Sequence, residues 1–170
     1  DTIFRRSSGL VRFVENYRKV TGIPTPVPEI IPVDNLLNSV VLLFREETDT
    51  IRILPSSSHL QVIADKTLIE QILINLIKNA LDATKDCPDP LIELSAGINT
   101  EGKTFIQVKD NGTGIPADVQ ERIFIPFFTT KPVGSGIGLS VSRQIMYMHK
   151  GSLTVISEAG KGSRFLLTFT

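Results

Sequence analysis

The chain has 170 residues, of which 41% are hydrophobic and 21% are charged, a composition typical of one globular domain with an appendage. Its 18 basic and 18 acidic side chains cancel, which argues against nucleic acid as a partner, because polyanion binders carry a basic excess. Cys87 is the single cysteine, so an internal disulfide is excluded and a reducing compartment is favoured. No apolar run approaches the roughly 20 residues that span a bilayer. We therefore expect a cytoplasmic chain, compatible with a parent protein anchored in the inner membrane.

The first 28 residues predict a unit separate from the main domain. Apolar side chains recur at helical spacing within residues 7–21, at Leu10, Phe13, Val14 and Tyr17. A lone amphipathic helix of this length is marginal in water, so it is expected to need a partner helix. The proline-rich run 24–28 predicts a stiff connector of polyproline character. We place the domain boundary there, with the main domain at 29–170.

The main domain predicts alternating helices and strands. Helices are expected at 34–47, 66–86, 117–123 and from the second glycine loop to about 149, and strands at 50–54, 60–64, 91–98, 103–109, 152–157 and 163–169. Asp34 is the expected N-cap of the first of these helices, and Asp65 or Thr67 that of the second. This order predicts an α+β fold, a two-layer sandwich with about three helices on one face of a mixed sheet of about five strands.

The helix at 66–86 carries a polar stripe on an otherwise apolar surface. At about 100° per residue its polar side chains fall within one arc of roughly 100°, at Gln71, Asn75, Lys78, Asn79 and Asp82. A solvent-facing stripe would explain this arc, but two asparagines one turn apart are poor helix formers and indicate a function. An amide oxygen is a hard, uncharged ligand, suited to a Mg²⁺ ion that phosphates already hold.

Two glycine-rich loops follow this helix in the chain. Asp110 ends a predicted strand and precedes Gly112 and Gly114, where backbone can approach a ligand closely and the carboxylate can accept a hydrogen bond from an exocyclic amine. The alternative for Asp110 is a simple turn former. The second loop, 134–139, leads directly into a helix, whose amides and positive end favour phosphate. It lacks the Gly-Lys-Ser/Thr ending of a Walker A loop and does not follow a strand as a Rossmann loop does.

Taken in order, these motifs resemble the catalytic and ATP-binding domain of bacterial sensor histidine kinases, within the gyrase, Hsp90, histidine kinase and MutL superfamily. The motifs are Asn75/Asn79, Asp110-x-Gly112-x-Gly114, the phenylalanines with Thr130-Lys131, Gly134-x-Gly136-x-Gly138-Leu139 and Gly160-x-Gly162-Ser163-x-Phe165. The resemblance covers about residues 30–170 and implies the Bergerat ATP-binding fold. The run 127–131 is similar to the nitrogen-regulation type of kinase. The helix at 7–21 resembles the second helix of the family's dimerisation and phosphoacceptor domain.

The resemblance also implies roles for individual residues. Asn79 would coordinate Mg²⁺, and Asn75 would support the metal or the phosphates. Asp110 would recognise the adenine amine, and Ser163 would help through a water molecule. Residues 116–135 would form a mobile lid from which Lys131 reaches the terminal phosphate. Backbone at Gly112, Gly114 and Ile115 would close around the base, and that at Gly134, Gly136, Ile137, Gly138 and Leu139 would cradle the phosphates. Lys78 and Arg143 are secondary phosphate candidates, with surface salt bridges as the alternative.

The implied reaction is transfer of the ATP γ-phosphate to a histidine, with Asn75, Asn79 and Lys131 as catalytic residues. The implied partners are a phosphoacceptor histidine domain upstream of residue 1, a response regulator receiver domain and a second subunit of a homodimeric parent. His59 and His149 are expected to be structural, so this chain should bind ATP without phosphorylating itself. Asn75 stands where hydrolytic branches carry Glu, and an amide cannot accept the proton of water, so slow hydrolysis is expected. The alternatives are a hydrolytic ATPase and an anti-sigma-type nucleotide-binding interaction module.

Overall fold

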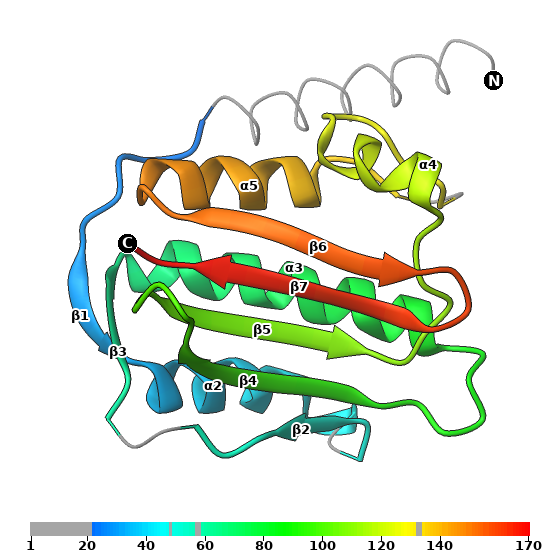
Figure 1. Ribbon diagram of the computed structural model, residues 1–170, viewed down its shortest axis with the longest axis horizontal. Helices are drawn as coiled ribbons and strands as arrows, with labels where there is room; N and C mark the ends of the chain where they lie inside the picture. The colour runs from blue at the N-terminus through cyan, green and yellow to red at the C-terminus, as the bar shows by residue number, and fades with distance from the viewer. Residues whose placement is uncertain (1–21, 48, 57–58, 132–133) are drawn as a thin grey trace, which may run out of the picture.

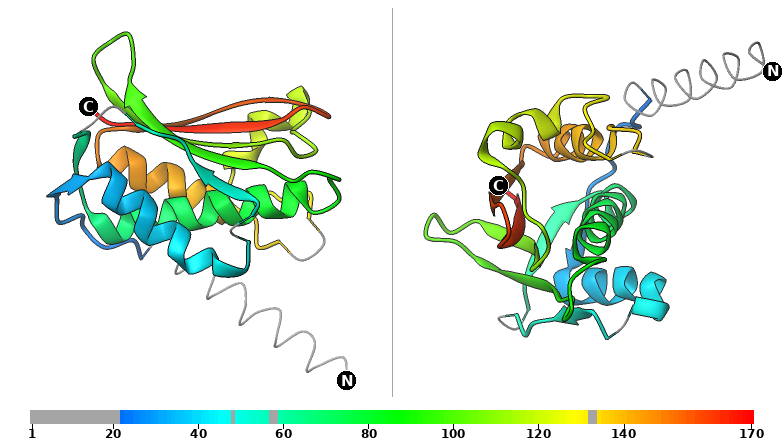
Figure 2. Two further views of the ribbon diagram at one scale, coloured as in Figure 1. Left: turned by 90° about the horizontal axis from the view of Figure 1, so that it is seen from below. Right: turned by 90° about the vertical axis from the view of Figure 1, so that its right-hand side faces the viewer.

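The computed structural model describes residues 22–47, 49–56, 59–131 and 134–170, so the helix predicted at 7–21 lies outside the described residues. Among these residues, three longer helices cover one face of the main sheet (Figure 1): α2 (Val33–Val41), α3 (Lys66–Thr84) and α5 (Gly138–Met148). Figure 2 shows the sheet and the helices as two separate layers. No helix in the described part of the chain has the length and apolarity needed to cross a membrane.

The main sheet is mixed and has five strands in the order β2-β4-β5-β7-β6. The strands are β2 (Ile51–Ile53), β4 (Ile92–Ile98), β5 (Thr104–Asp110), β6 (Ser152–Glu158) and β7 (Gly162–Thr168). β2 runs parallel to β4, and the other neighbouring pairs are antiparallel. The predicted two-layer α+β fold with a mixed five-stranded sheet is therefore confirmed.

The core lies between the two layers and follows the sequence periodicities. Strand β4 buries alternate residues, Ile92 and Leu94 among them, because side chains of a strand alternate between its faces. Helix α3 buries the apolar side chains Ile69, Ile72, Leu73, Leu76 and Ile77 completely. The polar stripe of α3 is consequently left at the edge of the helix layer, where it stays at least partly exposed.

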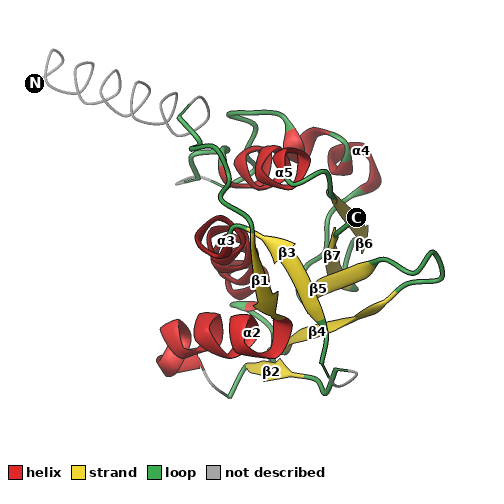
Figure 3. Ribbon diagram, turned by 90° about the vertical axis from the view of Figure 1, so that its left-hand side faces the viewer, coloured by secondary structure: helices red, strands yellow, loops and turns green. Residues whose placement is uncertain are grey.

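A second, two-stranded sheet was not predicted. Strand β1 (Glu29–Pro32) pairs antiparallel with β3 (Gln61–Ala64), at the left edge of Figure 1 and facing the viewer in Figure 3. Prolines at both ends hide β1 in the sequence, because proline lacks the N–H that a strand ladder uses. The strands predicted at 50–54 and 60–64 both exist, but they belong to different sheets.

The prediction of one helix at 34–47 capped by Asp34 is wrong. Pro32 is the N-cap residue, because the chain passes directly from β1 into α2, and Asp34 lies in the first turn, where Ser56 Oγ donates to its Oδ1 at 2.6 Å. The α-helix ends at Val41, and a 3₁₀ segment, η1 (Leu42–Glu47), follows with Phe44 at φ −113° and ψ 48°. This break buries the Phe44 ring in the core.

Asp65 is the N-cap of α3, one of the two residues predicted for that role. Its Oδ1 accepts a hydrogen bond from Leu68 N at 3.1 Å, and its Oδ2 accepts one from Val27 N at 3.0 Å. The hydrogen bond from Val27 N in particular, together with that from Leu68 N, lowers the pKa of Asp65. The connector 22–28 is thereby tied to the start of α3.

The segment between β5 and α5 contains short helical turns rather than one helix at 117–123. These are α4 (Ala117–Gln120), which packs beside β6, and the 3₁₀ turn η2 (Arg122–Phe124). Pro116 precedes α4, as expected for proline at a helix start. The segment runs around the right-hand edge of the molecule in Figure 1 and returns to the start of α5.

Candidate functional site

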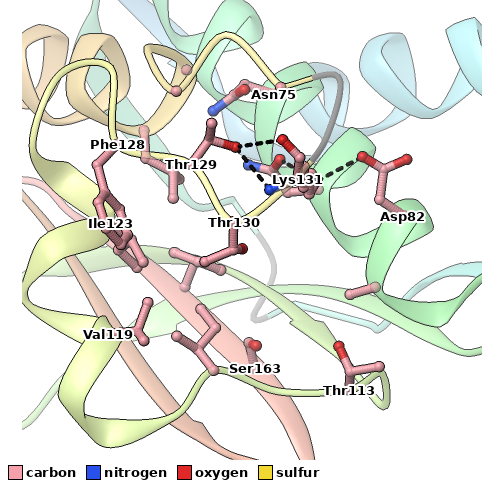
Figure 4. Close-up of a pocket in the computed structure, with 18 of the residues that line it drawn as sticks. Asn75, Asp82, Thr113, Val119, Ile123, Phe128, Thr129, Thr130, Lys131 and Ser163 are labelled. Atoms are coloured by element: carbon pink, nitrogen blue, oxygen red, sulfur yellow. Dashed lines mark hydrogen bonds and ion pairs between the residues drawn. The ribbon is translucent and has the colours of Figure 1, made fainter.

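A cavity of about 630 Å³ lies between α3, the ends of β5 and β7, and the segment that joins β5 to α5 (Figure 4). Most of the predicted site residues line it: Asn75, Asn79, Asp110, Gly114, Ile115, Lys131, Gly134, Gly136, Gly138, Leu139 and Ser163. Gly112 and Ile137 do not line it. The fold thus brings residues nearly 90 positions apart into one cavity, in which Asn75 and Ser163 lie on opposite sides in Figure 4.

Asp110 is a buried carboxylate with a defined orientation. Its side chain is 5% exposed, and its Oδ1 accepts hydrogen bonds from Gly112 N at 2.9 Å and Ser163 N at 3.2 Å. Burial raises the pKa of Asp110, and the two backbone donors act in the opposite direction. With Oδ1 occupied by these donors, Oδ2 is the oxygen left to accept a hydrogen bond from a ligand.

Gly112 and Gly162 hold the backbone around Asp110 rather than lining the cavity. A Cβ on Gly112 would collide with the carbonyl of Ala83 at the end of α3, and a Cβ on Gly162, whose φ is +89°, would collide with the carbonyl of Asp110. Thr113, which follows Gly112, donates its N–H to the same Ala83 carbonyl oxygen at 3.1 Å. The loop after β5 is thereby packed against α3, and this packing fixes the position of the carboxylate.

The polar stripe of α3 faces the cavity at Asn75, Asn79 and Asp82. Lys131 reaches across to it: its Nζ lies 2.6 Å from Asp82 Oδ2 and donates to Asn79 Oδ1 at 3.2 Å (Figure 4). Asp82 belongs to the predicted stripe, but nothing in the sequence around it predicts a role for its side chain. The amide oxygen of Asn79 therefore already faces a cation within the cavity.

Asn75 joins α3 to α5. Its Nδ2 donates to Ser142 Oγ at 3.1 Å, which leaves its Oδ1 beside Gly138 at the first turn of α5. A Cβ on Gly138 would collide with this Oδ1. Gly138 is needed so that the amide of Asn75 and the start of α5 can both border the cavity. No side chain caps that helix start, so its N–H groups remain available to an anion.

We expect Gly138→Ala to destabilise the fold by about 1–3 kcal/mol, because the new methyl group must displace Asn75 or the start of α5. Thermal and urea unfolding measure this change. The same substitution in an Asn75→Ala background should be clearly less destabilising, since the colliding oxygen is gone. An equal effect of Gly138→Ala in both backgrounds would show that the contact with Asn75 is not the cause.

Two phenylalanines of the predicted lid lie against arginine side chains. Arg122 lies over the Phe128 ring at 4.4 Å from the centroid, and Arg143 lies over Phe124 at 4.8 Å. Phe128 lines the cavity, whereas Phe124 packs against the core. Arg143 and the exposed Lys78, the two secondary phosphate candidates, do not line the cavity.

The histidines lie outside the cavity lining. Both ring nitrogens of His149 are used: Nδ1 lies 2.7 Å from Ile145 O, and Nε2 accepts from Asp65 N at 2.9 Å. A backbone N–H can only donate, so Nε2 is the acceptor of the Asp65 bond, and His149 links α5 to the start of α3 through both ring nitrogens. His59 lies before β3 with φ at 72°.

The cavity residues fit a magnesium nucleotide. Within the described ranges no three His, Cys, Asp or Glu side chains are grouped as a metal site. Mg²⁺ commonly binds through one or two protein oxygens together with substrate phosphates and water. The Asn79 side-chain oxygen already accepts a hydrogen bond from the Lys131 ammonium group, and Asp82 contacts the same ammonium group.

The fold and the site together define an α+β domain of the nucleotide-binding type, in which a helix presents two asparagines to a cavity bordered by glycines. Residues 64–170 match the family model described as histidine kinase-, DNA gyrase B-, and HSP90-like ATPase. The chain belongs to this family. The match begins at the end of β3 and includes every cavity residue described above.

Curated relatives and solved structures agree with this assignment. The chain is 37% identical over 148 residues to the C4-dicarboxylate transport sensor protein DctB of Rhizobium meliloti (strain 1021), covering 87% of this chain and 23% of that protein. The chain thus spans about a quarter of that relative's length. The nucleotide-free catalytic domain of histidine kinase ThkA has a TM-score of 0.72 and 32% identity, covering 84% of this chain and 95% of that one.

Two longer structures are also similar. Full-length ShkA in complex with AMPPNP has a TM-score of 0.76 and 27% identity, covering 99% of this chain and 37% of that one. Histidine kinase ThkA in complex with the response regulator protein TrrA has a TM-score of 0.75 and 28% identity, covering 99% of this chain and 49% of that one.

Proposed function

We propose that this chain is the ATP-binding catalytic domain of a sensor histidine kinase and transfers the ATP γ-phosphate to a histidine on a phosphoacceptor domain. The observation that carries this proposal is the cavity itself. At one end of the cavity lies the buried carboxylate of Asp110, whose Oδ2 is free to accept a hydrogen bond. At the other end Asn79 and Asp82 form a corner in which their oxygens already contact a cation, the Lys131 ammonium group. These two groups suit the two ends of a nucleoside triphosphate.

The base end of the cavity would recognise adenine. Asp110 Oδ2 would accept a hydrogen bond from the exocyclic amine, and Ser163 lies beside it through its own N–H bond to Asp110 Oδ1. Gly114, with φ at +67°, packs so closely on the Glu158 carbonyl that a side chain there would collide with it. Gly114 and Ile115 would therefore present backbone to the base.

The phosphate end would use the lid and the start of α5. Asn79, with Asn75 beside it, would hold Mg²⁺ through the amide oxygen, and the metal when bound would neutralise charge on the phosphates. Lys131 would bind the terminal phosphate. The glycines Gly134, Gly136 and Gly138, with Ile137 and Leu139, would offer backbone N–H groups to the remaining oxygens. Positioning and charge neutralisation are the main protein contributions to phosphoryl transfer.

The residues bordering the cavity favour a transferase over a hydrolase. Among the described lining residues the carboxylates are Asp82 and Asp110. Asp82 lies beside Asn79, where it would face the metal once the terminal phosphate draws Lys131 away, and Asp110 is bound to backbone near the base. Asn75 is an amide whose nitrogen donates to Ser142. No lining carboxylate in the described part of the chain is thus left to activate water, and the γ-phosphate would be kept for an imidazole acceptor.

The family and the neighbouring structures support a proposal for the partners. We propose a phosphoacceptor histidine domain and a response regulator receiver domain as partners, within a homodimeric parent. The helix predicted at 7–21, which lies outside the described residues, would belong to the phosphoacceptor unit. We propose a cytoplasmic location for this domain. The nitrogen-regulation subtype, proposed from the run 127–131, is a further proposal of the same kind.

The test is label transfer from γ-labelled MgATP. We expect the chain, supplied with the parent's phosphoacceptor domain, to label one histidine of that domain with an acid-labile, alkali-stable phosphate. The chain alone should stay unlabelled, because His149 is engaged through both ring nitrogens. Release of phosphate at a comparable rate without an acceptor would favour the hydrolytic ATPase, and label on His59 or His149 would overturn the assignment.

A further inference from the structure

Two serine hydroxyl groups lie side by side at the end of the hairpin formed by β6 and β7. Ser157 and Ser163 are direct partners in the strand register, and their Oγ atoms are 3.0 Å apart. Ser163 lines the cavity, whereas Ser157 lies behind it and does not. Nothing in the sequence predicts this contact of Ser157, because a serine at the end of a predicted strand is ordinary unless the strand register is known.

The hydrogen bonds around Ser157 determine the position of its proton. Ile115 N donates to Ser157 Oγ at 2.8 Å, and Ser157 Oγ donates to Gly162 O at 2.8 Å. A backbone N–H can only donate and a carbonyl can only accept, so the single hydroxyl proton of Ser157 is used by Gly162. The bond between the two serines must therefore take its proton from Ser163. Toward the cavity, Ser163 then offers only lone pairs.

We propose that Ser157 is a positioning residue for base selection, which it exerts by fixing Ser163 as a hydrogen-bond acceptor. This inference rests on the proposed function. Asp110, bound to Ser163 N through its Oδ1, adds a second acceptor beside it. At its 6-position a 6-amino purine presents an N–H donor, which would meet these acceptors. A 6-oxo purine presents an oxygen at the same position, and this acceptor facing acceptors disfavours its binding.

Ser157 also supports the surrounding backbone, so a test must separate the two effects. Gln120 Nε2 donates to the carbonyl of Ser157 at 2.8 Å and to that of Ile115 at 2.9 Å, which ties α4 to the same hairpin. Losing the Ser157 hydroxyl leaves Ile115 N and Gly162 O without this partner. General loosening of this kind weakens all purine nucleotides together, whereas a freed Ser163 proton changes the preference between them.

The experiment measures the dissociation constants of MgADP and MgIDP by calorimetry. In the wild type we expect ADP to bind more tightly than IDP. In Ser157→Ala the ratio of the IDP to the ADP constant should fall about five- to tenfold, the effect of about one neutral hydrogen bond. Ser157→Thr keeps the hydroxyl and should keep the ratio. Valine has the shape of threonine but lacks the hydroxyl, so Ser157→Val should lower the ratio. Both residues favour strands, so the Thr and Val variants can replace the alanine variant in this test if the latter does not fold.

A double-mutant cycle shows whether Ser157 acts through Ser163. In a Ser163→Ala background, Ser157→Ala should leave the nucleotide ratio unchanged, because the proton that Ser157 controls is absent. Ser95→Ala is the matched control: Ser95 is a half-buried strand serine that accepts from Gln107 Nε2 at 3.3 Å and does not line the cavity. Its ratio should equal that of the wild type.

The outcomes distinguish this inference from the proposed function. If the wild type binds neither nucleotide, the proposed function fails and the role of Ser157 fails with it. If the wild type prefers ADP and the Ser157→Ala and Ser157→Val variants weaken both nucleotides equally, only the role of Ser157 is overturned. A ratio that falls in both variants and is preserved in Ser157→Thr supports it.

Discussion

Replacing Asp110 with asparagine is expected to weaken MgADP binding by about 100-fold while leaving the fold intact. The asparagine Oδ1 can still accept the hydrogen bonds from Gly112 N and Ser163 N, so the backbone around it should be kept. Its Nδ2 then replaces the free carboxylate oxygen, and a donor faces the exocyclic amine of adenine, which is also a donor. Calorimetric titration measures the change.

The same variant has a predicted pH signature in stability. Burial raises the pKa of Asp110, so the ionised form is disfavoured in the folded state. Its contribution to the free energy of unfolding is therefore fully present below the unfolded-state pKa and is lost as pH rises through the raised folded-state pKa. Asparagine does not titrate. The stability of the variant relative to the wild type should thus increase with pH over that interval, as measured by urea unfolding.

The control for both measurements is Asp118→Asn, the same chemical change at an exposed position of α4 outside the cavity. It should bind MgADP like the wild type. If Asp110→Asn bound MgADP within about threefold of the wild type, Asp110 would not be the residue that reads the base.

Replacing Lys131 with methionine is expected to slow phosphoryl transfer in the parent kinase by about 100- to 1000-fold, the range found when one charge-stabilising donor is removed from an active site. Affinity for MgADP should change far less. In the nucleotide-free protein, Asp82 and Asn79 bind the Lys131 ammonium group where the metal ion is proposed to bind. We expect the terminal phosphate of ATP to draw the lysine away from them. Since ADP lacks this phosphate, its binding should be nearly insensitive to the lysine.

Rates of label transfer and calorimetry with MgADP together measure the two halves of this expectation. Lys161→Met is the matched control, because Lys161 forms an exposed ion pair with Glu158 in the β6/β7 turn and lies outside the cavity. A Lys131→Met protein that transfers phosphate at the wild-type rate would show that Lys131 does not act on the terminal phosphate.

The sequence predicted those parts of the site that are encoded locally. The two asparagines of α3 share a face because a helix has a fixed period, and Asp110 ends a strand whose alternation continues up to it. Glycines before a predicted helix indicated the start of α5, which begins at Gly138. Each of these inferences needs only the geometry of one element.

The sequence could not predict features that depend on how remote elements meet. The ion pair between Lys131 and Asp82 joins positions 49 residues apart, and the sequence around either residue does not predict its partner. Ser157 acquires a role only through its register with Ser163. Strand β1 is masked by its prolines and is recognisable only by its pairing with β3. The single helix expected at 34–47 failed because tertiary packing of Phe44 overrides a continuous apolar period.

The most direct test of the account is a crystal structure of the chain with AMPPNP and Mg²⁺. We predict that Asp110 Oδ2 lies within hydrogen-bond distance of the exocyclic amine and that Asn79 Oδ1 lies at about 2.1 Å from the metal. Lys131 Nζ should have left Asp82 for the terminal phosphate. A nucleotide bound outside this cavity, or a base that does not contact Asp110, would contradict the account.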